Sequence, residues 1–267
     1  MEDLTIALWQ TPFASGSAEA LQRLDAAAER ARAEGAELLV TPEMALTGYA
    51  IGADRVATLA EPASGPLAQA VGAIARRHGL AIAYGYPEAH VDGAPYNAAQ
   101  FIDADGKRLA NYRKTHLFGN LDRSQFSAGE AAPRVFMYRG WRLGLLICYD
   151  VEFPEAVRLL ALQGADAVLV PTANMEPFDE VQRVLLPARA LENRLYVAYA
   201  NACGQEAGLA YNGLSGVYGP AGRTLAQATS PDVGLVQVTL SSSALAAART
   251  TSPLHDRRGD LYGLPTD

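Results

Sequence analysis

Short apolar segments alternate with helical segments along this 267-residue chain, and later in each half strand-like segments follow one another without a helix between them. Parallel strands need a crossover connection, usually a helix, whereas consecutive strands can pair through a tight turn. This mixture predicts an α/β fold with two sheets that carry helices on their outer faces, a four-layer α-β-β-α sandwich. We expect one domain over residues 1–267, with a C-terminal tail from about residue 250.

The expected elements follow from hydrophobic periodicity and from turn signals at Gly and Pro. The segments with strand character are 4–9, 36–41, 80–86, 97–102, 108–112, 141–147, 166–171, 195–200, 213–218 and 233–240. The segments with helical character are 17–34, 66–78, 154–163 and 180–193. A chain of this length can bury a full core.

Cys148 is the most informative single residue, because it directly follows the apolar run Trp141-Arg-Leu-Gly-Leu-Leu-Ile147. A helical stretch then opens at Phe153-Pro154. A thiol on the turn between a strand and a helix is held rigidly, as a nucleophile requires. An isolated cysteine is also commonly a small buried hydrophobe, so this segment alone leaves both interpretations open.

A carboxylate and an ammonium occupy similar positions in two other segments. Glu43 lies just past the apolar run 36–40, and Lys114 follows the strand-like segment 107–112. The strand ends of an α/β sheet commonly share one crevice. Either residue alone would be interpreted as a surface charge, but together with Cys148 they indicate a single site.

Three motifs resemble the nitrilase, or carbon–nitrogen hydrolase, superfamily, in its order and with about its separations. They are Pro42-Glu43-Met-Ala-Leu-Thr-Gly48-Tyr49, Tyr112-Arg113-Lys114-Thr-His-Leu and Cys148-Tyr149-Asp150-Val-Glu-Phe153-Pro154-Glu155. The resemblance extends over essentially the whole chain and implies the same four-layer sandwich. The Cys-Tyr-Asp form is similar to the amidase and carbamoylase branches, whereas true nitrilases usually carry Cys-Trp-Glu.

The resemblance also implies a mechanism. Glu43 takes the proton of Cys148, and the thiolate attacks the amide carbon. The Lys114 ammonium and the backbone N–H of Tyr149 hold the oxyanion. Protonated Glu43 then protonates the leaving ammonia, and water activated by the same carboxylate hydrolyses the acyl thioester. No cofactor is expected.

The resemblance implies three further pocket residues. Related amidases often carry a second glutamate eight residues after the lysine, and here that place is Asp122, one methylene shorter. Asp122 either lines the pocket or is a turn residue that hydrogen-bonds its own backbone. Asn174 and Glu176 follow the strand 166–171, in a region that the family uses for substrate contacts. The alternative interpretation is that both residues belong to the N-terminal segment of a helix.

Other polar residues near these motifs are expected to be structural. Arg189 and Glu192 form an (i, i+3) pair on a helix that family members use for dimer packing, which favours a homo-oligomer, a dimer or larger. Cys203 is expected to be an inert buried thiol. His116 is expected to support the Lys114 loop, although a Cys–His site with Cys148 is the alternative.

Composition narrows the possible partners and compartments. The net charge of −7 argues against nucleic acid, because phosphate binding requires a basic surface. No apolar run reaches the roughly 18 residues that suggest a membrane span. The four histidines have no paired metal-ligand spacing, so we expect no metal site. Two cysteines cannot build a disulfide framework, which favours the reducing cytoplasm.

The leading functional hypothesis is a thiol amidohydrolase that converts small primary aliphatic amides to carboxylic acid and ammonia. An N-carbamoyl amine hydrolase is the second hypothesis. Carbamoyl acids are disfavoured, because the stretch 172–180 holds three acidic residues and no Lys or Arg. A non-catalytic binding or redox thiol protein on the same scaffold is the third. Similarity to bacterial amidases for ω-amino amides suggests 5-aminopentanamide as a substrate, with Glu176 facing its ammonium.

Overall fold

Two six-stranded sheets form the centre of the computed structural model, within the residues that it describes, 1–229 and 232–262. The first sheet has the order β14-β1-β2-β3-β4-β5, and the second has the order β13-β12-β9-β8-β7-β6. The strands of the first sheet are β1 Leu4–Gln10, β2 Leu38–Val40, β3 Ala81–Glu88, β4 Tyr96–Ile102, β5 Arg108–Arg113 and β14 Gly234–Leu240. Those of the second are β6 Val135–Tyr138, β7 Trp141–Leu145, β8 Ala167–Thr172, β9 Tyr196–Asn201, β12 Gly216–Tyr218 and β13 Thr224–Gln227.

Each sheet has three parallel strands at its centre and antiparallel strands at its edges. In the first sheet β1, β2 and β3 are parallel, and in the second β7, β8 and β9 are parallel. Helices α1 Ser17–Ala33 and α3 Pro66–His78 provide the crossovers of the first sheet. Helix α5 Pro154–Leu162 and the pair η2 Val181–Leu185 and α6 Leu186–Asn193 provide those of the second.

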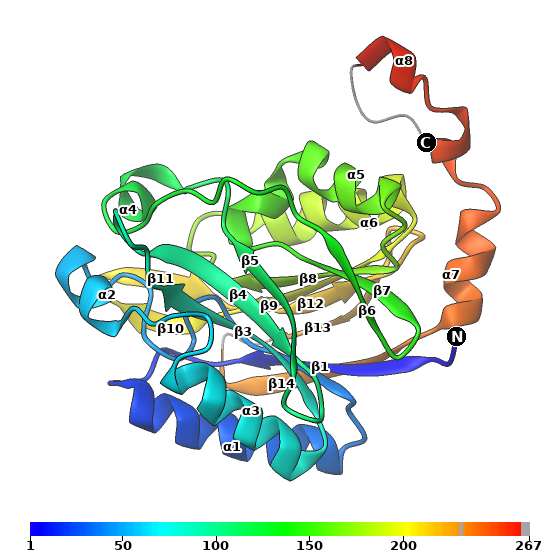
Figure 1. Ribbon diagram of the computed structural model, residues 1–267. Helices are drawn as coiled ribbons and strands as arrows, with labels where there is room; N and C mark the ends of the chain where they lie inside the picture. Colours follow the sequence, from blue (N-terminus) through cyan, green and yellow to red (C-terminus); the bar gives the residue numbers. More distant parts are fainter. Residues whose placement is uncertain (230–231, 263–267) are drawn as a thin grey trace.

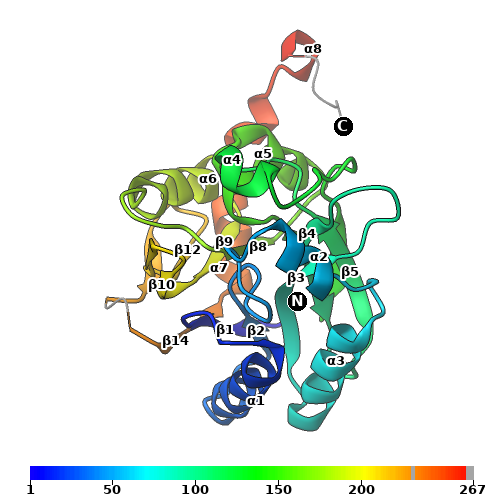
Figure 2. The same ribbon diagram turned by 90° about the vertical axis from the view of Figure 1, so that its left-hand side faces the viewer.

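The helices lie on the two outer sides of the paired sheets, which confirms the predicted α-β-β-α sandwich. Figure 1 shows α1 and α3 on one side of the sheets and α5 and α6 on the other, and Figure 2 shows the same order from a second direction. The two sheets cover each other's inner faces, and each layer of helices covers the outer face of one sheet. Both faces of each sheet are therefore apolar.

Strand residues alternate between the core shared by the sheets and the core under the first layer of helices. Leu4, Ile6 and Leu8 of β1 pack in the first of these cores, and Ala7 and Trp9 pack in the second. Successive side chains of a strand point to opposite faces, so both faces of β1 must be apolar. This explains why residues 6–9 of β1 are a continuous apolar run rather than an alternating one.

Smaller elements surround the strand ends. They are α2 Ala53–Leu59, α4 Gly119–Arg123, the turn η1 Cys148–Glu152 and the hairpin of β10 Cys203–Glu206 with β11 Leu209–Asn212. After β14 the chain forms α7 Ser242–Arg249, η3 Pro253–Asp256 and α8 Gly259–Tyr262. Figure 1 shows α8 standing away from the layered body, in the region where a tail is expected.

Candidate active site

Glu43 lies beyond β2, where the two sheets meet. Its backbone N–H donates to the carbonyl oxygen of Thr172, at the end of β8, over 3.2 Å. Strand β3 passes so close that a Cβ atom at Gly85 would lie 2.5 Å from the backbone nitrogen of Met44. Met44 has a positive φ of 52°, in the left-handed region. The backbone around Glu43 is therefore fixed by close packing and by a bond to the second sheet.

Lys114 directly follows β5 and lies between two carboxylates. Its Nζ is 2.8 Å from Oε1 of Glu43 and 2.7 Å from Oδ2 of Asp122. All three side chains are fully buried. Its backbone N–H donates to the carbonyl oxygen of Asn97, which extends the pairing of β4 with β5 by one residue. The structure thus brings together two residues that lie 71 positions apart in the sequence.

Asp122 reaches Lys114 because the short helix α4 turns it inward. Its Oδ1 accepts a hydrogen bond from the Tyr49 hydroxyl at 2.7 Å, and its Oδ2 accepts one from the backbone N–H of Phe118 at 2.8 Å. Asp122 therefore binds the lysine and also accepts a hydrogen bond from the backbone of its own loop. A contact between Asp122 and the substrate stays a prediction. The shorter aspartate side chain still reaches Lys114.

Cys148 is the first residue of the turn η1, which connects the end of β7 to α5. Its φ is +45°, a left-handed conformation that is costly for a residue with a Cβ atom. The thiol forms hydrogen bonds with the side chain of Thr172 and the backbone of Ala173. Cys148 is partly exposed, in contrast to Glu43 and Lys114. Cys148 therefore combines a constrained backbone with a buried thiol in a residue that is otherwise partly exposed.

The pKa values of these groups follow from burial and from their mutual charges. Burial raises the pKa of Glu43, although the Lys114 ammonium opposes this effect. Burial lowers the pKa of Lys114, but the Glu43 and Asp122 carboxylates outweigh it, and the pKa ends well above its usual value. Burial and the Glu43 carboxylate raise the pKa of the Cys148 thiol. Lys114 is thus a permanent cation, and the thiol needs a base.

Glu43 has one carboxylate oxygen in use and one free. Its Oε1 accepts hydrogen bonds from Lys114 and from the side-chain amide of Asn97. Its Oε2 is buried and has no hydrogen-bond partner among the residues that the structure describes. Sequence analysis missed Asn97, whose signal was a polar amide within the mostly apolar strand β4, Tyr96-Asn-Ala-Ala-Gln-Phe-Ile102. A free oxygen on a buried carboxylate is suited to accept a proton.

Tyr149 lies in the first turn of η1, where backbone N–H groups have no acceptor within the helix. Its ring belongs to a row of aromatic contacts. The Tyr149 ring lies edge-on to Phe118, with centroids 5.3 Å apart, and to Phe153 at 5.0 Å. Phe118 in turn contacts Phe178 at 5.7 Å. Apolar rings therefore flank the turn that carries the thiol.

Asn174 is buried but its amide is occupied. Its Nδ2 donates to the carbonyl oxygen of Phe178 at 2.8 Å and to Oε1 of Gln182 at 3.1 Å. Its backbone N–H donates to Oδ1 of Asn201. These bonds hold the loop after β8 against the helical segment 181–193 and the end of β9. The structure thus gives Asn174 a supporting position in the loop after β8.

Glu176 is exposed and lies away from the buried pair. It lines a surface cavity of about 430 Å³. The other lining residues are Pro177, Asp179, Arg183, Asn212, Leu214 and Thr229. Neither Glu43, Lys114 nor Cys148 lines this cavity. The structure therefore does not bring Glu176 together with the other predicted site residues.

The structure shows the surroundings of the residues that are expected to be structural. His116 lies 2.8 Å from Asp150 through Nδ1 and stacks on Phe153, with ring centroids 3.9 Å apart. Arg189 pairs with Glu192 at 3.1 Å and also donates to the backbone carbonyls at the end of η1. Cys203 is a buried free thiol at the start of β10, and burial raises its pKa to about 11.

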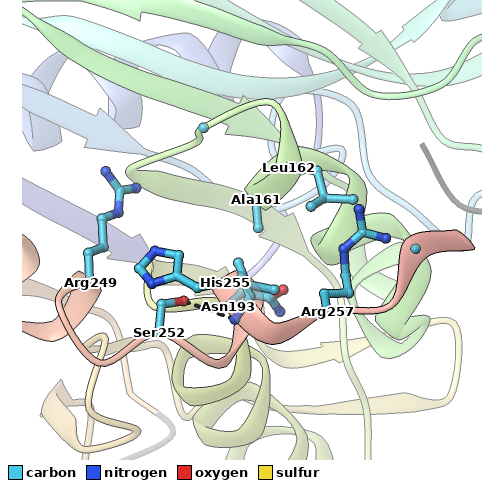
Figure 3. Close-up of a pocket in the computed structure, with 10 residues that line it drawn as sticks. Ala161, Leu162, Asn193, Arg249, Ser252, His255 and Arg257 are labelled. Carbon is cyan, nitrogen blue, oxygen red and sulfur yellow. Dashed lines mark hydrogen bonds between the residues drawn. The ribbon is translucent and has the colours of Figure 1, made fainter. Parts of the chain in front are cut away.

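The structure has other cavities, and Figure 3 shows one of about 370 Å³ between the end of α5, Asn193 of α6 and the C-terminal segment. Its labelled side chains are Ala161, Leu162, Asn193, Arg249, Ser252, His255 and Arg257. Across residues 1–229 and 232–262, no three His, Cys, Asp or Glu side chains gather in a way that could hold a metal ion. In the same ranges no helix is both long and apolar enough to cross a membrane.

The chemistry of the site suits acyl transfer from an amide, because a thiol, a buried base and a buried cation supply a nucleophile, a proton acceptor and an oxyanion partner. Residues 5–250 match the model of the carbon–nitrogen hydrolase family, and the chain belongs to this family, in the nitrilase superfamily. It is an amidohydrolase.

Its relatives include a hydrolase in the pqqF 5′ region of Pseudomonas protegens, 51% identical over 98% of this chain and 92% of the relative. An (R)-stereoselective amidase of a Pseudomonas species is 39% identical over 86% of this chain and 83% of the relative. The crystal structure of an amidase from a Nesterenkonia species has a TM-score of 0.84 and 37% identity, covering 97% of this chain and 95% of that chain.

Proposed function

We propose that this amidohydrolase cleaves small primary aliphatic amides to a carboxylic acid and ammonia through a thioester on Cys148. The free, buried Oε2 of Glu43 carries this proposal, because it leaves one base available in a site whose thiol has a raised pKa. Lys114 cannot be that base, since its own pKa lies well above the usual value.

The proposed reaction begins with proton transfer from the Cys148 thiol to Glu43. The sulfur attacks the carbonyl carbon, and the oxyanion is stabilised by Lys114 and by the backbone N–H of Tyr149. Collapse of the intermediate breaks the carbon–nitrogen bond, and Glu43 gives its proton to the leaving ammonia. Water, deprotonated by Glu43, then hydrolyses the thioester. Asp122 holds Lys114 throughout.

Two observations support a short aliphatic acyl group. The aromatic rings of Phe118, Tyr149 and Phe153 flank the η1 turn and offer an apolar surface. The Nesterenkonia amidase was solved in complex with butyramide and in complex with acrylamide. That amidase was also solved with the acetamide moiety of fluoroacetamide added covalently at its active-site cysteine.

We further propose that the acyl chain ends in an amine, as in 5-aminopentanamide. Glu176 lies on a separate surface cavity, so it is a weak candidate for binding the ammonium. Glu152, at the end of η1, is a stronger one. Its part-buried carboxylate has no hydrogen-bond or ion-pair partner in the described ranges, and burial together with Glu180 raises its pKa. Lys114 and Arg189 already oppose this rise, and a substrate ammonium near Glu152 would add to their effect.

The substrate proposal is tested by kcat/KM for 5-aminopentanamide and for pentanamide, in the wild type and in two variants. If Glu152 binds the ammonium, Glu152→Gln lowers the ratio of the two constants about tenfold, as expected for a lost charge-assisted hydrogen bond. Glu176→Gln is the matched control and should leave the ratio unchanged. A wild-type preference for pentanamide would remove the ω-amino amide from the proposal but not the amidase activity.

The alternative substrate class is an N-carbamoyl amine. It is favoured over carbamoyl acids by the absence of Lys and Arg from residues 172–180. A panel of primary amides, carbamoyl compounds and nitriles separates the possibilities. Ammonia without carbon dioxide indicates an amidase, and ammonia with carbon dioxide indicates a carbamoylase. No ammonia from any primary amide would refute the proposed function.

We also propose a homo-oligomer, a dimer or larger, that uses the outer face of α6. Leu191 on this helix is 44% exposed, and Val184 on the preceding η2 is 60% exposed. Sedimentation of the wild type and of Leu191→Glu tests this contact.

Two free cysteines favour the cytoplasm as the compartment. Because both sheets supply site residues, we propose that the chain acts as one catalytic domain.

A further inference from the structure

Asp150 is a buried carboxylate that the mechanism above does not use. Its Oδ1 lies within hydrogen-bond distance of the backbone nitrogen and hydroxyl of Thr115, at 3.2 and 2.9 Å, and of the backbone nitrogen and Nδ1 of His116, at 2.9 and 2.8 Å. Its Oδ2 accepts from the Tyr112 hydroxyl at 3.0 Å and from the backbone N–H of Ile147 at 3.2 Å. The side chain is fully buried.

These partners belong to the two segments that carry the nucleophile and the cation. Lys114 lies between Tyr112 and Thr115, which both donate to Asp150. Cys148 lies between Ile147 and Asp150 itself. The first segment continues β5 of one sheet, and the second continues β7 of the other. One carboxylate therefore spans the gap between the sheets at the point where the reacting groups lie.

We propose that Asp150 is a positioning residue that fixes the Cys148 turn relative to Lys114, so that sulfur and ammonium address the same carbonyl group. This inference rests on the proposed function. It assigns Asp150 no contact with substrate. Asp150 acts through the backbone of Ile147 on one side and through Thr115 and His116 on the other.

The chemistry of the partners explains why a carboxylate stands here. An ionised carboxylate only accepts hydrogen bonds, and here both oxygens face donors. An asparagine of the same shape would turn an NH2 group toward one set of donors, either the Tyr112 hydroxyl and the Ile147 N–H or the Thr115 and His116 groups. Asp150→Asn therefore keeps the volume but loses one set of bonds.

The opposite end of η1 is held by a different residue. The Arg189 guanidinium donates to the carbonyl oxygens of Val151 at 3.1 Å and Glu152 at 2.6 Å. The nucleophile turn is thus anchored at its start by Asp150 and at its end by Arg189. Only the anchor at the start also reaches the Lys114 segment, so a variant at Asp150 should affect the alignment of the two reacting groups.

The first measurement compares kcat and KM of the wild type and Asp150→Asn with a short primary amide. Misalignment by about 1 Å can lower the rate about 10²-fold, so kcat should fall by about this factor, with KM changed less than about threefold. Asp166→Asn is the matched control. Asp166 is also a buried aspartate, but it binds Arg142 and Arg249 at the start of the β7–β8 pairing, and its kcat should stay near that of the wild type.

A double-mutant cycle with Lys114→Met separates positioning from general support of the fold. If Asp150 acts by aligning Lys114 with Cys148, then Asp150→Asn should cause little further loss once Lys114 is absent. If the two losses multiply, or if folded Asp150→Asn keeps kcat within threefold of the wild type, the proposal is wrong. An inactive wild type would instead refute the proposed function.

A milder variant keeps the proposal testable if Asp150→Asn does not fold. Tyr112→Phe combined with Thr115→Ala removes one hydroxyl donor from each oxygen of Asp150 and leaves its charge in place. We expect kcat to fall about three- to tenfold at unchanged KM, in line with the loss of neutral hydrogen bonds. An unchanged kcat in this double variant would overturn the inference.

Discussion

Lys114 is held between two buried carboxylates, and this arrangement decides which proton transfers the site can carry out. The cation is fixed by Glu43 at 2.8 Å and by Asp122 at 2.7 Å. Both carboxylates favour its charged form, so it can stabilise an oxyanion but cannot take the thiol proton. We therefore propose Glu43 as the base, because its second oxygen has no partner in the described part of the chain.

The first prediction separates these two charged residues. Lys114→Met removes the proposed oxyanion partner, and the loss of one such donor typically lowers turnover about 10²–10³-fold. Glu43→Gln removes the base and the acid together and should be at least as severe. Ammonia release from a short primary amide measures both. If either purified, folded variant keeps near-wild-type turnover, its assigned role is wrong.

The second prediction concerns pH. Because burial raises the pKa of Glu43 above the ordinary value of 4.5, its carboxylate is protonated, and the base is lost, at a higher pH than usual. The acid limb of kcat/KM should therefore lie above 4.5. Asn97→Ala removes a hydrogen bond that lowers the Glu43 pKa, so the limb should move further up. A limb at or below 4.5, or a downward shift in the variant, contradicts the role of Glu43 as base.

The sequence indicates the reacting residues better than the residues around them. Glu43, Lys114 and Cys148 each lie within two residues of the end of a strand-like segment. Strand ends converge in an α/β fold, so the types and positions of these residues suffice to group them. Glu176 also follows a strand end, but an exposed loop can turn a side chain either way. Asn97 lies in a strand and Asp150 in a motif, each beside apolar residues. Their polar partners come from distant segments, so the local sequence does not indicate them.

At the scale of elements, close backbone approach between neighbouring strands shapes the site. Gly85 of β3 lies against the chain that carries Glu43, and a Cβ atom there would lie 2.5 Å from the nitrogen of Met44 and 3.0 Å from Cα of Glu43. The neighbour is backbone and cannot rotate away. A side chain at this position would have to push Glu43 away from its place beside Lys114.

The third prediction follows from this contact. Gly85→Ala should lower the free energy of unfolding by about 1–3 kcal/mol, as overpacking does, and should reduce kcat about 10²-fold by displacing Glu43. Gly234→Ala is the control, since a Cβ atom there meets nothing within 4 Å. Its stability should change by less than about 0.5 kcal/mol. If the two variants have the same free energy of unfolding in denaturant melts and the same kcat, the contact at Gly85 does not position Glu43.

Long, well-bounded elements were predictable from the sequence, and short edge strands were not. Helix α3 occupies the predicted residues Pro66–His78, because a proline begins it and a left-handed Gly79 ends it. Strands β6, β10, β11 and β13 have only four residues each. A segment of four residues has too little periodicity to stand out from a loop.

At the scale of the whole molecule, the active site exists only because two sheets pack face to face. Glu43 and Lys114 come from the first sheet, whereas Cys148 and Thr172 come from the second. The last strand, β14, returns to pair with β1, so the first sheet contains both early and late parts of the chain. The pattern of residues 233–240 predicts a strand, but the partner of this strand depends on long-range packing that no local pattern encodes.

The thioester on Cys148 is the central claim, and intact mass spectrometry tests it most directly. The wild-type protein, quenched in acid during turnover of a short primary amide, should gain the mass of one acyl group, located on Cys148 by peptide mapping. Cys148→Ala should show neither the adduct nor ammonia release, whereas Cys203→Ala should show both. Substantial turnover by folded Cys148→Ala, or an acyl group found on another residue, would contradict the account.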